Sequence, residues 1–141
     1  MTEPVLLPHL RRFLEANPAG VLATSRPDGV PRQSVVYHLV DGDRLLISTE
    51  ATRAKARDVE RTGRASYCVV GAAKPYPQVS VTGSARILTD DIGGHTARLF
   101  EIISGNASAP MSDDVLAAIG RVLLELVVER VVVAQYLPEE G

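Results

Sequence analysis

The sequence predicts a mainly β protein, a small β-barrel or half-open barrel with short helices, formed by one domain over residues 1–141. Short apolar runs recur along the chain, and turn-forming residues separate them. Two of these runs flank Arg-Pro-Asp-Gly at residues 26–29, a combination that makes a tight hairpin turn. The third observation is a Val-rich run at residues 121–136, whose composition favours a strand.

Local patterns place each expected element along the chain. Six segments carry strand signals, at residues 20–25, 30–40, 44–49, 64–70, 78–88 and 121–136. Four segments carry helix signals, at residues 7–16, 53–62, 90–104 and 112–120. Because tight turns connect the first three strands, we expect these strands to lie side by side as an antiparallel meander.

For two of these elements, the sequence pattern also bears on which face is buried or which structure forms. The helix after the third strand should turn Ala54 and Val59 inward and Arg57 and Arg61 outward. In the last segment, charged residues spaced four apart would suit a helix face, but the Val residues and the alternating pattern favour a strand. We adopt the strand, so that the barrel is built from six strands.

Composition and charge exclude several classes of protein. Hydrophobic content of 45% and charged content of 23% are values of a globular chain, and the net charge of −2 gives no general attraction to nucleic acid or membrane. A single cysteine excludes an intrachain disulfide. The chain begins without the pattern of a signal peptide and has no apolar run of about 18 residues, so we expect a cytoplasmic protein.

The common catalytic and metal-binding motifs are absent from the sequence. We find no GxSxG, HExxH, P-loop or strand-linked GxGxxG pattern, and we assign no catalytic residue and no metal ligand. His9, His38 and His95 lie far apart, so we expect ordinary surface or barrel-rim histidines. Cys68 lies in an apolar strand without nearby cations and is expected to be a packed thiol.

One stretch, STEATRAKARDV at residues 48–59, has the composition of an anion site. Ser48 and Thr49 end a strand, and Arg53 and Lys55 follow in the first turn of the next helix, where cations oppose the helix dipole. A bound phosphate would resolve this conflict, because helix N–H groups, hydroxyls and cations all favour it. The alternative is a solvated basic helix face.

A second polar group strengthens the case for a site. Arg32, Gln33 and Ser34 interrupt an otherwise apolar strand. If the second and third strands are neighbours, these side chains converge with the strand end and helix start described above.

The segments from residue 20 to residue 88 together resemble the pyridoxamine-phosphate-oxidase-like split-barrel flavoproteins. The motifs that carry the likeness are the GVLAT strand, the D-G-x-P hairpin, and R-A-K followed by a G-R-A-S strand start. The likeness is closest to short actinobacterial members that use coenzyme F420, an 8-hydroxy-5-deazaflavin. It implies a homodimeric split barrel with two cofactor sites at the dimer interface.

The resemblance also implies which positions contact the cofactor. The second strand would lie along the ring, the third-strand end and the helix start would take the ribityl and phosphate groups, and the loop at residues 74–78 would approach the partner's cofactor. The matching positions are Arg32, Gln33, Ser34, Val35, Val36, Ser48, Thr49, Thr52, Arg53, Ala54, Lys55 and Tyr76.

Departures from the family pattern narrow the function. Pyridoxamine phosphate oxidases proper have a lysine near the end of the second strand and a C-terminal Trp/Arg region. This chain has Tyr37 and His38 at that strand end and no Trp, so we do not expect vitamin B6 oxidation, and we favour F420 over FMN.

The resemblance implies hydride transfer between the cofactor and a small unsaturated organic substrate, with Tyr37, His38 and Tyr76 as possible proton donors. One alternative is a carrier or sensor that binds flavin or deazaflavin without turnover. Another is an OB-like single-strand binder, which the few aromatic residues and the lack of basic surplus oppose.

Overall fold

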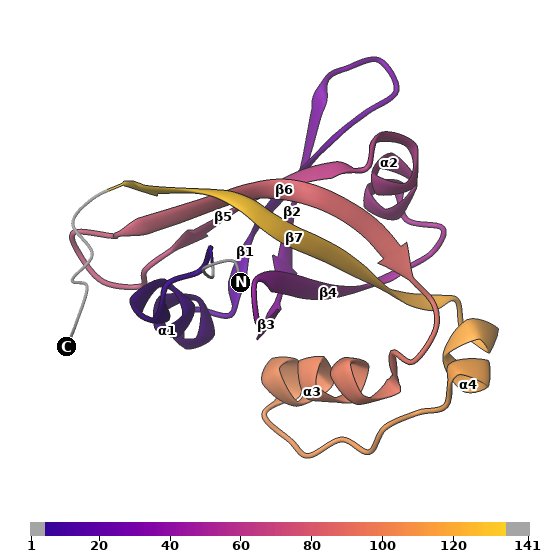
Figure 1. Ribbon diagram of the computed structural model, residues 1–141. Helices are drawn as coiled ribbons and strands as arrows, with labels where there is room; N and C mark the ends of the chain where they lie inside the picture. Colours follow the sequence, from indigo (N-terminus) through magenta and orange to yellow (C-terminus); the bar gives the residue numbers. More distant parts are fainter. Residues whose placement is uncertain (1–4, 135–141) are drawn as a thin grey trace.

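The computed structural model describes residues 5–134 and shows a mainly β chain in which one antiparallel sheet curls into a half-open barrel (Figure 1). The strands are β1 (Ala19–Ser25), β2 (Pro31–Tyr37), β3 (Leu39–Asp41), β4 (Arg44–Glu50), β5 (Arg64–Val70), β6 (Gln78–Leu88) and β7 (Arg121–Ala134). The helices are α1 (Pro8–Ala16), α2 (Ala54–Thr62), α3 (Gly93–Ser104) and α4 (Asp113–Ala118).

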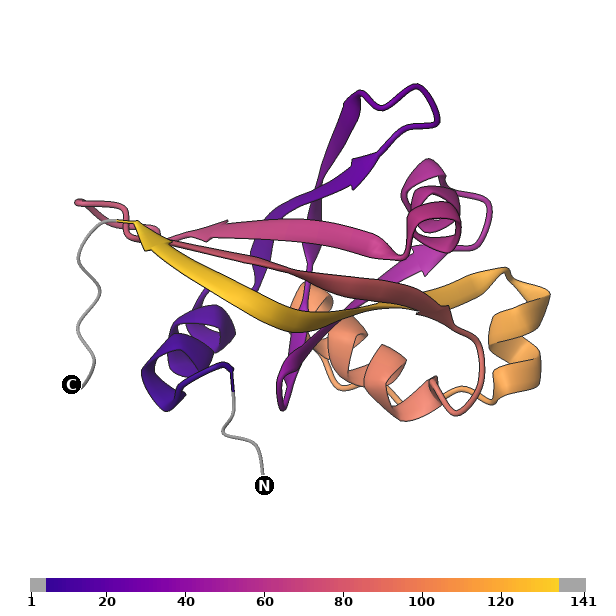
Figure 2. The ribbon, with the colours of Figure 1, turned by 45° about the horizontal axis from the view of Figure 1, so that its top comes forward.

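The order of strands across the sheet is β2-β1-β5-β6-β7-β4-β3, with every neighbouring pair antiparallel. The long strands β6 and β7 pair along their length and cross the molecule, as the view in Figure 2 also shows. The β1–β2 hairpin projects from one side of the sheet, next to α2 (Figures 1 and 2). Among the described strands, this order leaves β2 and β3 at the edges of the sheet.

Apolar side chains fill two cores because β4 and β7 are covered on both faces. Leu45 and Ile47 of β4 pack inside the barrel with residues of β1, β5, β6, β7 and α1. Leu46, between them, points to the other face and packs with Leu99 of α3 and Leu116 of α4. The three consecutive buried positions of β4 follow from this two-sided packing.

The predicted meander is wrong at one point. The expected strand at residues 30–40 is divided at His38, whose N–H donates to the Pro18 carbonyl at 2.9 Å and whose side chain is buried. The part before His38 pairs with β1, and the part after it, β3, pairs with β4. The described part of the chain therefore forms seven strands, and β2 and β4 are not hydrogen-bonded neighbours.

The remaining elements agree with the sequence predictions apart from their boundaries. The Val-rich tail is a strand from Arg121 to Ala134, and residues 135 and 136 of the predicted segment lie outside the described part. The α3 helix begins at Gly93, because the Asp113 carboxylate accepts hydrogen bonds from the N–H groups of Asp91 and Ile92 just before it.

One helix face differs from its prediction. Ala54 is exposed, whereas Ala56, Asp58 and Val59 form the buried face of α2. Across residues 5–134, none of the helices combines the length and the apolar character needed to cross a bilayer.

Candidate functional site

An open cavity of about 290 Å³ lies where the end of β4, the start of α2 and the end of β2 meet. The α3 helix and the start of β7 complete its wall. The lining residues are Val35, Val36, Tyr37, Ser48, Thr49, Glu50, Arg53, Lys55, Ile103 and Arg121. Five elements of the fold, or the turns between them, thus contribute to one cavity.

The structure brings together part of the set predicted from sequence. Val35, Val36, Ser48, Thr49, Arg53 and Lys55 line the cavity. Arg32, Gln33, Ser34, Thr52, Ala54 and Tyr76 are not among its lining residues. The convergence arises from the curl of the sheet, which brings edge strand β2 across to β4, and not from the adjacent pairing that the sequence suggested.

Tyr76 lies on the loop between β5 and β6, where its side chain is exposed. This loop is at the opposite end of the sheet from α2 (Figure 1). Within one chain, Tyr76 therefore does not reach the cavity.

The start of α2 is strongly electropositive. Arg53 is the N-cap residue in extended conformation, no side chain caps the helix, and the first turn has no acidic residue. Burial lowers the pKa of Lys55, and the positive charge of Arg53 lowers it further. Two cations thus sit at the positive end of a helix dipole, an arrangement that an anion would stabilise.

Only one carboxylate of the cavity opposes these cations. Glu50 lies 3.7 Å from Arg53 and 3.6 Å from Arg121, and all three side chains are partly exposed. Ion pairs of this length and exposure contribute little free energy. Arg53 therefore remains available to bind an anion.

Ser48 supplies a second sign that the cavity takes a polar ligand. Its hydroxyl oxygen is buried and has no hydrogen-bond partner among the described residues. A buried hydroxyl without a partner costs free energy, about 1–3 kcal/mol for a typical polar group. A ligand oxygen in the cavity would remove this cost.

His38 does not belong to the site, and the expectation of a surface or barrel-rim histidine is wrong. Its side chain is buried, with Nδ1 2.6 Å from the Tyr67 hydroxyl and Nε2 2.8 Å from the Leu14 carbonyl oxygen. Burial lowers the pKa of His38, and the hydrogen bond to Leu14 partly offsets this. His38 therefore fastens α1 to the barrel.

Several cavity residues were not predicted as cofactor contacts. Tyr37 was considered only as a proton donor, and Glu50 lies inside the stretch that suggested the anion site. Ile103 and Arg121 come from α3 and β7, and no local pattern links them to the cavity. They arrive through the packing of α3 and the pairing of β7 with β4, which were not predictable from local sequence.

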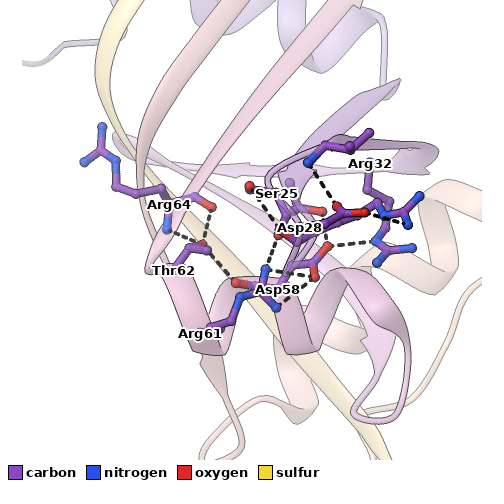
Figure 3. A network of polar contacts seen from close by, with 10 residues as sticks. Ser25, Asp28, Arg32, Asp58, Arg61, Thr62 and Arg64 are labelled. Atoms are coloured by element: carbon purple, nitrogen blue, oxygen red, sulfur yellow. Dashed lines mark hydrogen bonds and ion pairs between the residues drawn. The ribbon is translucent and has the colours of Figure 1, made fainter.

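Sequence reasoning also missed a buried ionic cluster beside the site. Asp58 of α2 accepts hydrogen bonds from Thr24 and Arg32, each at 2.8 Å, and from Arg61 at 3.2 Å (Figure 3). Burial raises the pKa of the Asp58 carboxyl, but the bonds from Arg32, Thr24 and Arg61 outweigh it and lower that pKa. Arg61 is thus an ion-pair partner and not part of a solvated basic face. The described residues contain no group of three His, Cys, Asp or Glu side chains placed to hold a metal ion.

The sequence of this chain matches the family described as Pyridoxamine 5'-phosphate oxidase over residues 6–133, and the chain therefore belongs to this family. The family has the split-barrel fold found here, binds flavin-type cofactors, is generally dimeric and includes oxidoreductases. The search of curated proteins gave no match.

Solved structures share the fold. A protein titled F420 Reductase shares 25% identity and a TM-score of 0.71, over 86% of this chain and 94% of that one. A conserved hypothetical protein from Mycobacterium tuberculosis shares 24% identity and a TM-score of 0.72, over 94% and 84% of the two chains. A putative pyridoxamine 5'-phosphate oxidase from Listeria innocua shares 19% identity and a TM-score of 0.71, over 89% and 94%.

Proposed function

We propose that this chain is a cytoplasmic oxidoreductase that binds coenzyme F420 in the cavity and transfers hydride to or from a small unsaturated organic molecule. FMN is the alternative cofactor. The observation that carries the proposal is the meeting of Ser48, Arg53 and Lys55 with the exposed end of β2 in one cavity. Membership of a flavin-binding family and the likeness to an F420 reductase support it.

The residues present fit the phosphate end of such a cofactor. Arg53 and Lys55 supply positive charge, the uncapped start of α2 supplies N–H donors, and Ser48 supplies a hydroxyl that lacks a partner. A volume of about 290 Å³ is at the small end for a binding pocket. We therefore expect the cavity to hold the phosphate end, with the ring extending along β2.

The end of β2 fits the ring. Val35 and Val36 offer an apolar wall, and β2 is an edge strand whose outer N–H and C=O groups have no partner strand within residues 5–134. Such groups can bond the polar edge of a flavin-like ring, as an added strand would.

When bound, F420 supplies a two-electron hydride carrier, and the chain supplies binding and orientation. Val35 and Ile103 supply the apolar rim on the ring side of the cavity. Of the possible proton donors Tyr37, His38 and Tyr76, Tyr37 is the one that lines the cavity. We assign its hydroxyl to hold the proton delivered to a reduced substrate.

We also propose that a second copy of the chain covers the cavity. Its apolar rim is open to solvent, with Val35 75% exposed and Ile103 47% exposed. In the dimer, Tyr76 and the loop at residues 74–78 would approach the partner's cofactor. Light scattering should give twice the chain mass of 15.1 kDa, and a monomer at micromolar concentration would contradict the dimer.

Cofactor titration tests the central proposal. Quenching of cofactor fluorescence should show tighter binding of F420 than of FMN, because Arg53 and Lys55 favour a phosphate extended by an acidic tail. FMN binding at least tenfold tighter would reject the deazaflavin assignment but keep a flavin enzyme. Binding of neither cofactor would reject the proposed function.

Single variants test the placement of the phosphate. Arg53→Ala and Lys55→Ala should each weaken F420 binding by about 1.5–3 kcal/mol, the range for hydrogen bonds to charged groups. Arg57→Ala is the matched control on the same helix, and its effect should be a few tenths of a kcal/mol at most. The empty Arg53 and Lys55 variants should melt no lower than wild type. Equal affinities in all three variants would leave α2 a basic helix without a site.

Turnover separates an enzyme from a carrier. Reduced holoprotein should pass hydride to an acceptor in a panel of enones, quinones and tetrapyrroles, followed by the return of the oxidised F420 absorbance. A holoprotein that binds F420 but reduces none of them would favour the carrier or sensor alternative.

A further inference from the structure

The Asp58 cluster joins α2 and β2, two of the elements that line the cavity. Asp58 is 1% exposed, and both of its carboxylate oxygens accept hydrogen bonds. Figure 3 shows Arg32 and Arg61 pointing at this carboxylate from β2 and from the next turn of α2. A buried carboxylate with this many donors is fully satisfied and held in one position.

This connection is the tie between α2 and β2. The two elements share no strand ladder, since β2 pairs only with β1 in the described part of the chain. Among the described residues, the hydrogen bond from Arg32 to Asp58 is the one that links α2 to β2. Arg61 and Thr24 bind the same cluster to β1, through the Ser25 carbonyl and the Asp58 carboxylate.

Along the chain, α2 runs from the cavity toward the Asp58 cluster, whereas β2 runs from the cluster toward the cavity. On α2, Lys55 precedes Asp58 by three residues, about 4.5 Å along a helix. On β2, Val36 follows Arg32 by four residues, about 13 Å along a strand. The Asp58 cluster itself lies outside the cavity. It therefore connects α2, on the phosphate side of the cavity, to β2, on the ring side.

We infer that Asp58 is a positioning residue that acts through Arg32 to fix the spacing between the start of α2 and the end of β2. This inference rests on the proposed function and deepens it, because it concerns how both ends of one cofactor bind at once. When two subsites are held at the correct spacing, the second end binds as if at high local concentration. A loose spacing loses that gain but leaves each subsite intact.

In this inference, Arg32 positions β2 and does not contact the cofactor directly. Its Nε donates to Asp58, and it does not line the cavity. Asp58 is too deeply buried to touch a ligand. A change in cofactor affinity on replacing Asp58 must therefore come through the geometry of the elements it joins.

The test compares the whole cofactor with its parts. Asp58→Asn and Arg32→Ala would be titrated, as full-length protein, with F420, with the ribityl deazaflavin that lacks the phosphate, and with inorganic phosphate as competitor. We expect the Kd for F420 to rise about tenfold in both variants and the values for the ribityl deazaflavin and for phosphate to change less than about twofold. The double variant should be no weaker than the weaker single variant.

Glu125→Gln is the matched control, because Glu125 is another buried carboxylate bound by two arginines, Arg44 and Arg86. It should leave all three affinities unchanged. If Asp58→Asn does not fold, Arg32→Ala still tests the inference, because Asp58 retains Thr24 and Arg61 as partners.

Each other result overturns the inference. Unchanged F420 affinity in both variants would show that the spacing does not depend on the cluster. If the variants weaken binding of the ribityl deazaflavin as much as binding of F420, the replaced side chains contact that part of the cofactor directly. If Glu125→Gln weakens F420 binding equally, the loss reflects a general loss of stability. If wild-type protein binds neither F420 nor FMN, the proposed function fails and the inference fails with it. If wild-type protein binds F420 and both variants bind it with the same Kd, only the inference is overturned.

Discussion

Asp58 and Glu125 are two buried carboxylates with similar chemistry and different positions in the fold. Asp58 is 1% exposed and Glu125 is 3% exposed, and each is bound by two arginines. Burial raises the pKa of the Glu125 carboxyl, but hydrogen bonds from Arg86 and Arg44 outweigh it, so its pKa is lowered like that of Asp58.

The two carboxylates differ in what they connect. Glu125 lies in β7 opposite Arg86 of β6, and Arg44 comes from β4, the strand on the other side. Backbone hydrogen bonds already fix these three strands. Asp58 instead joins a helix to an edge strand that has no backbone bond to it. An ionic cluster inside a ladder can only add stability, whereas one between separate elements can also set their spacing.

The largest expected effect tests what the two clusters share. Asp58→Ala and Glu125→Ala should each lower the free energy of unfolding by about 2–3 kcal/mol, because buried ion pairs are lost and two arginines are left without their carboxylate. The loss should be larger at Asp58, since Arg86 beside Glu125 is 71% exposed and can return to water. Urea unfolding at pH 7 measures both. A loss below about 0.5 kcal/mol at either site would mean that its cluster is not formed in solution.

Local sequence signals were enough to predict most elements of the fold and one part of the candidate site. The strands and helices were largely predictable, because apolar spacing and the Asp-Gly turn are local signals. That Ser48, Thr49, Arg53 and Lys55 would lie together was predictable for the same reason, since Ser48 to Lys55 is one continuous stretch.

The ionic clusters were not predictable, because their partners are distant in sequence. Arg32 and Asp58 are 26 residues apart, and Arg44 and Glu125 are 81 apart. Each of these residues by itself looks like a surface charge. The break at His38 was hidden too, because a histidine between Tyr37 and Leu39 does not by itself end a strand. Burial of its ring between α1 and β5 redirects the chain.

Acid should weaken both clusters. A carboxyl with a lowered folded pKa contributes stability above its unfolded pKa, about 3.9 for Asp and 4.3 for Glu, and loses it as the pH falls through the folded pKa. We expect the stability of wild type to decrease by about 1–2 kcal/mol more than that of Asp58→Asn or Glu125→Gln between pH 6 and pH 3. Urea titrations at four pH values check this. Parallel curves for wild type and variants would contradict the lowered pKa values.

Replacement of Arg61 should lower the stability of the protein and leave its affinity for F420 nearly unchanged. Arg61→Ala should cost about 1 kcal/mol of stability, because it removes one donor to Asp58 and the bond to the Ser25 carbonyl. F420 affinity should change by a few tenths of a kcal/mol at most, since Arg32 still ties β2 to Asp58. Thermal melts and F420 titration of the same samples measure both effects, with Arg57→Ala as the exposed control. A tenfold loss of affinity in Arg61→Ala would place the tie in β1 and not in β2.

The smallest expected effect concerns His38, a buried titratable group away from the cavity. Its folded pKa is lowered, mainly by burial, so the unfolded chain takes up a proton near pH 6.5 and the folded chain takes it up only at a lower pH. The stability that His38 contributes should therefore be fully present well above pH 6.5 and fall by roughly 0.5 kcal/mol between pH 7 and pH 5.5. His38→Gln can still donate to the Leu14 carbonyl, and its stability should not vary over this range.

If His38 only fastens α1, this variant, like Glu125→Gln, should bind F420 with wild-type affinity. A pH dependence that survives in His38→Gln would assign the effect to another group, and a loss of F420 binding would show that the attachment of α1 also shapes the cavity.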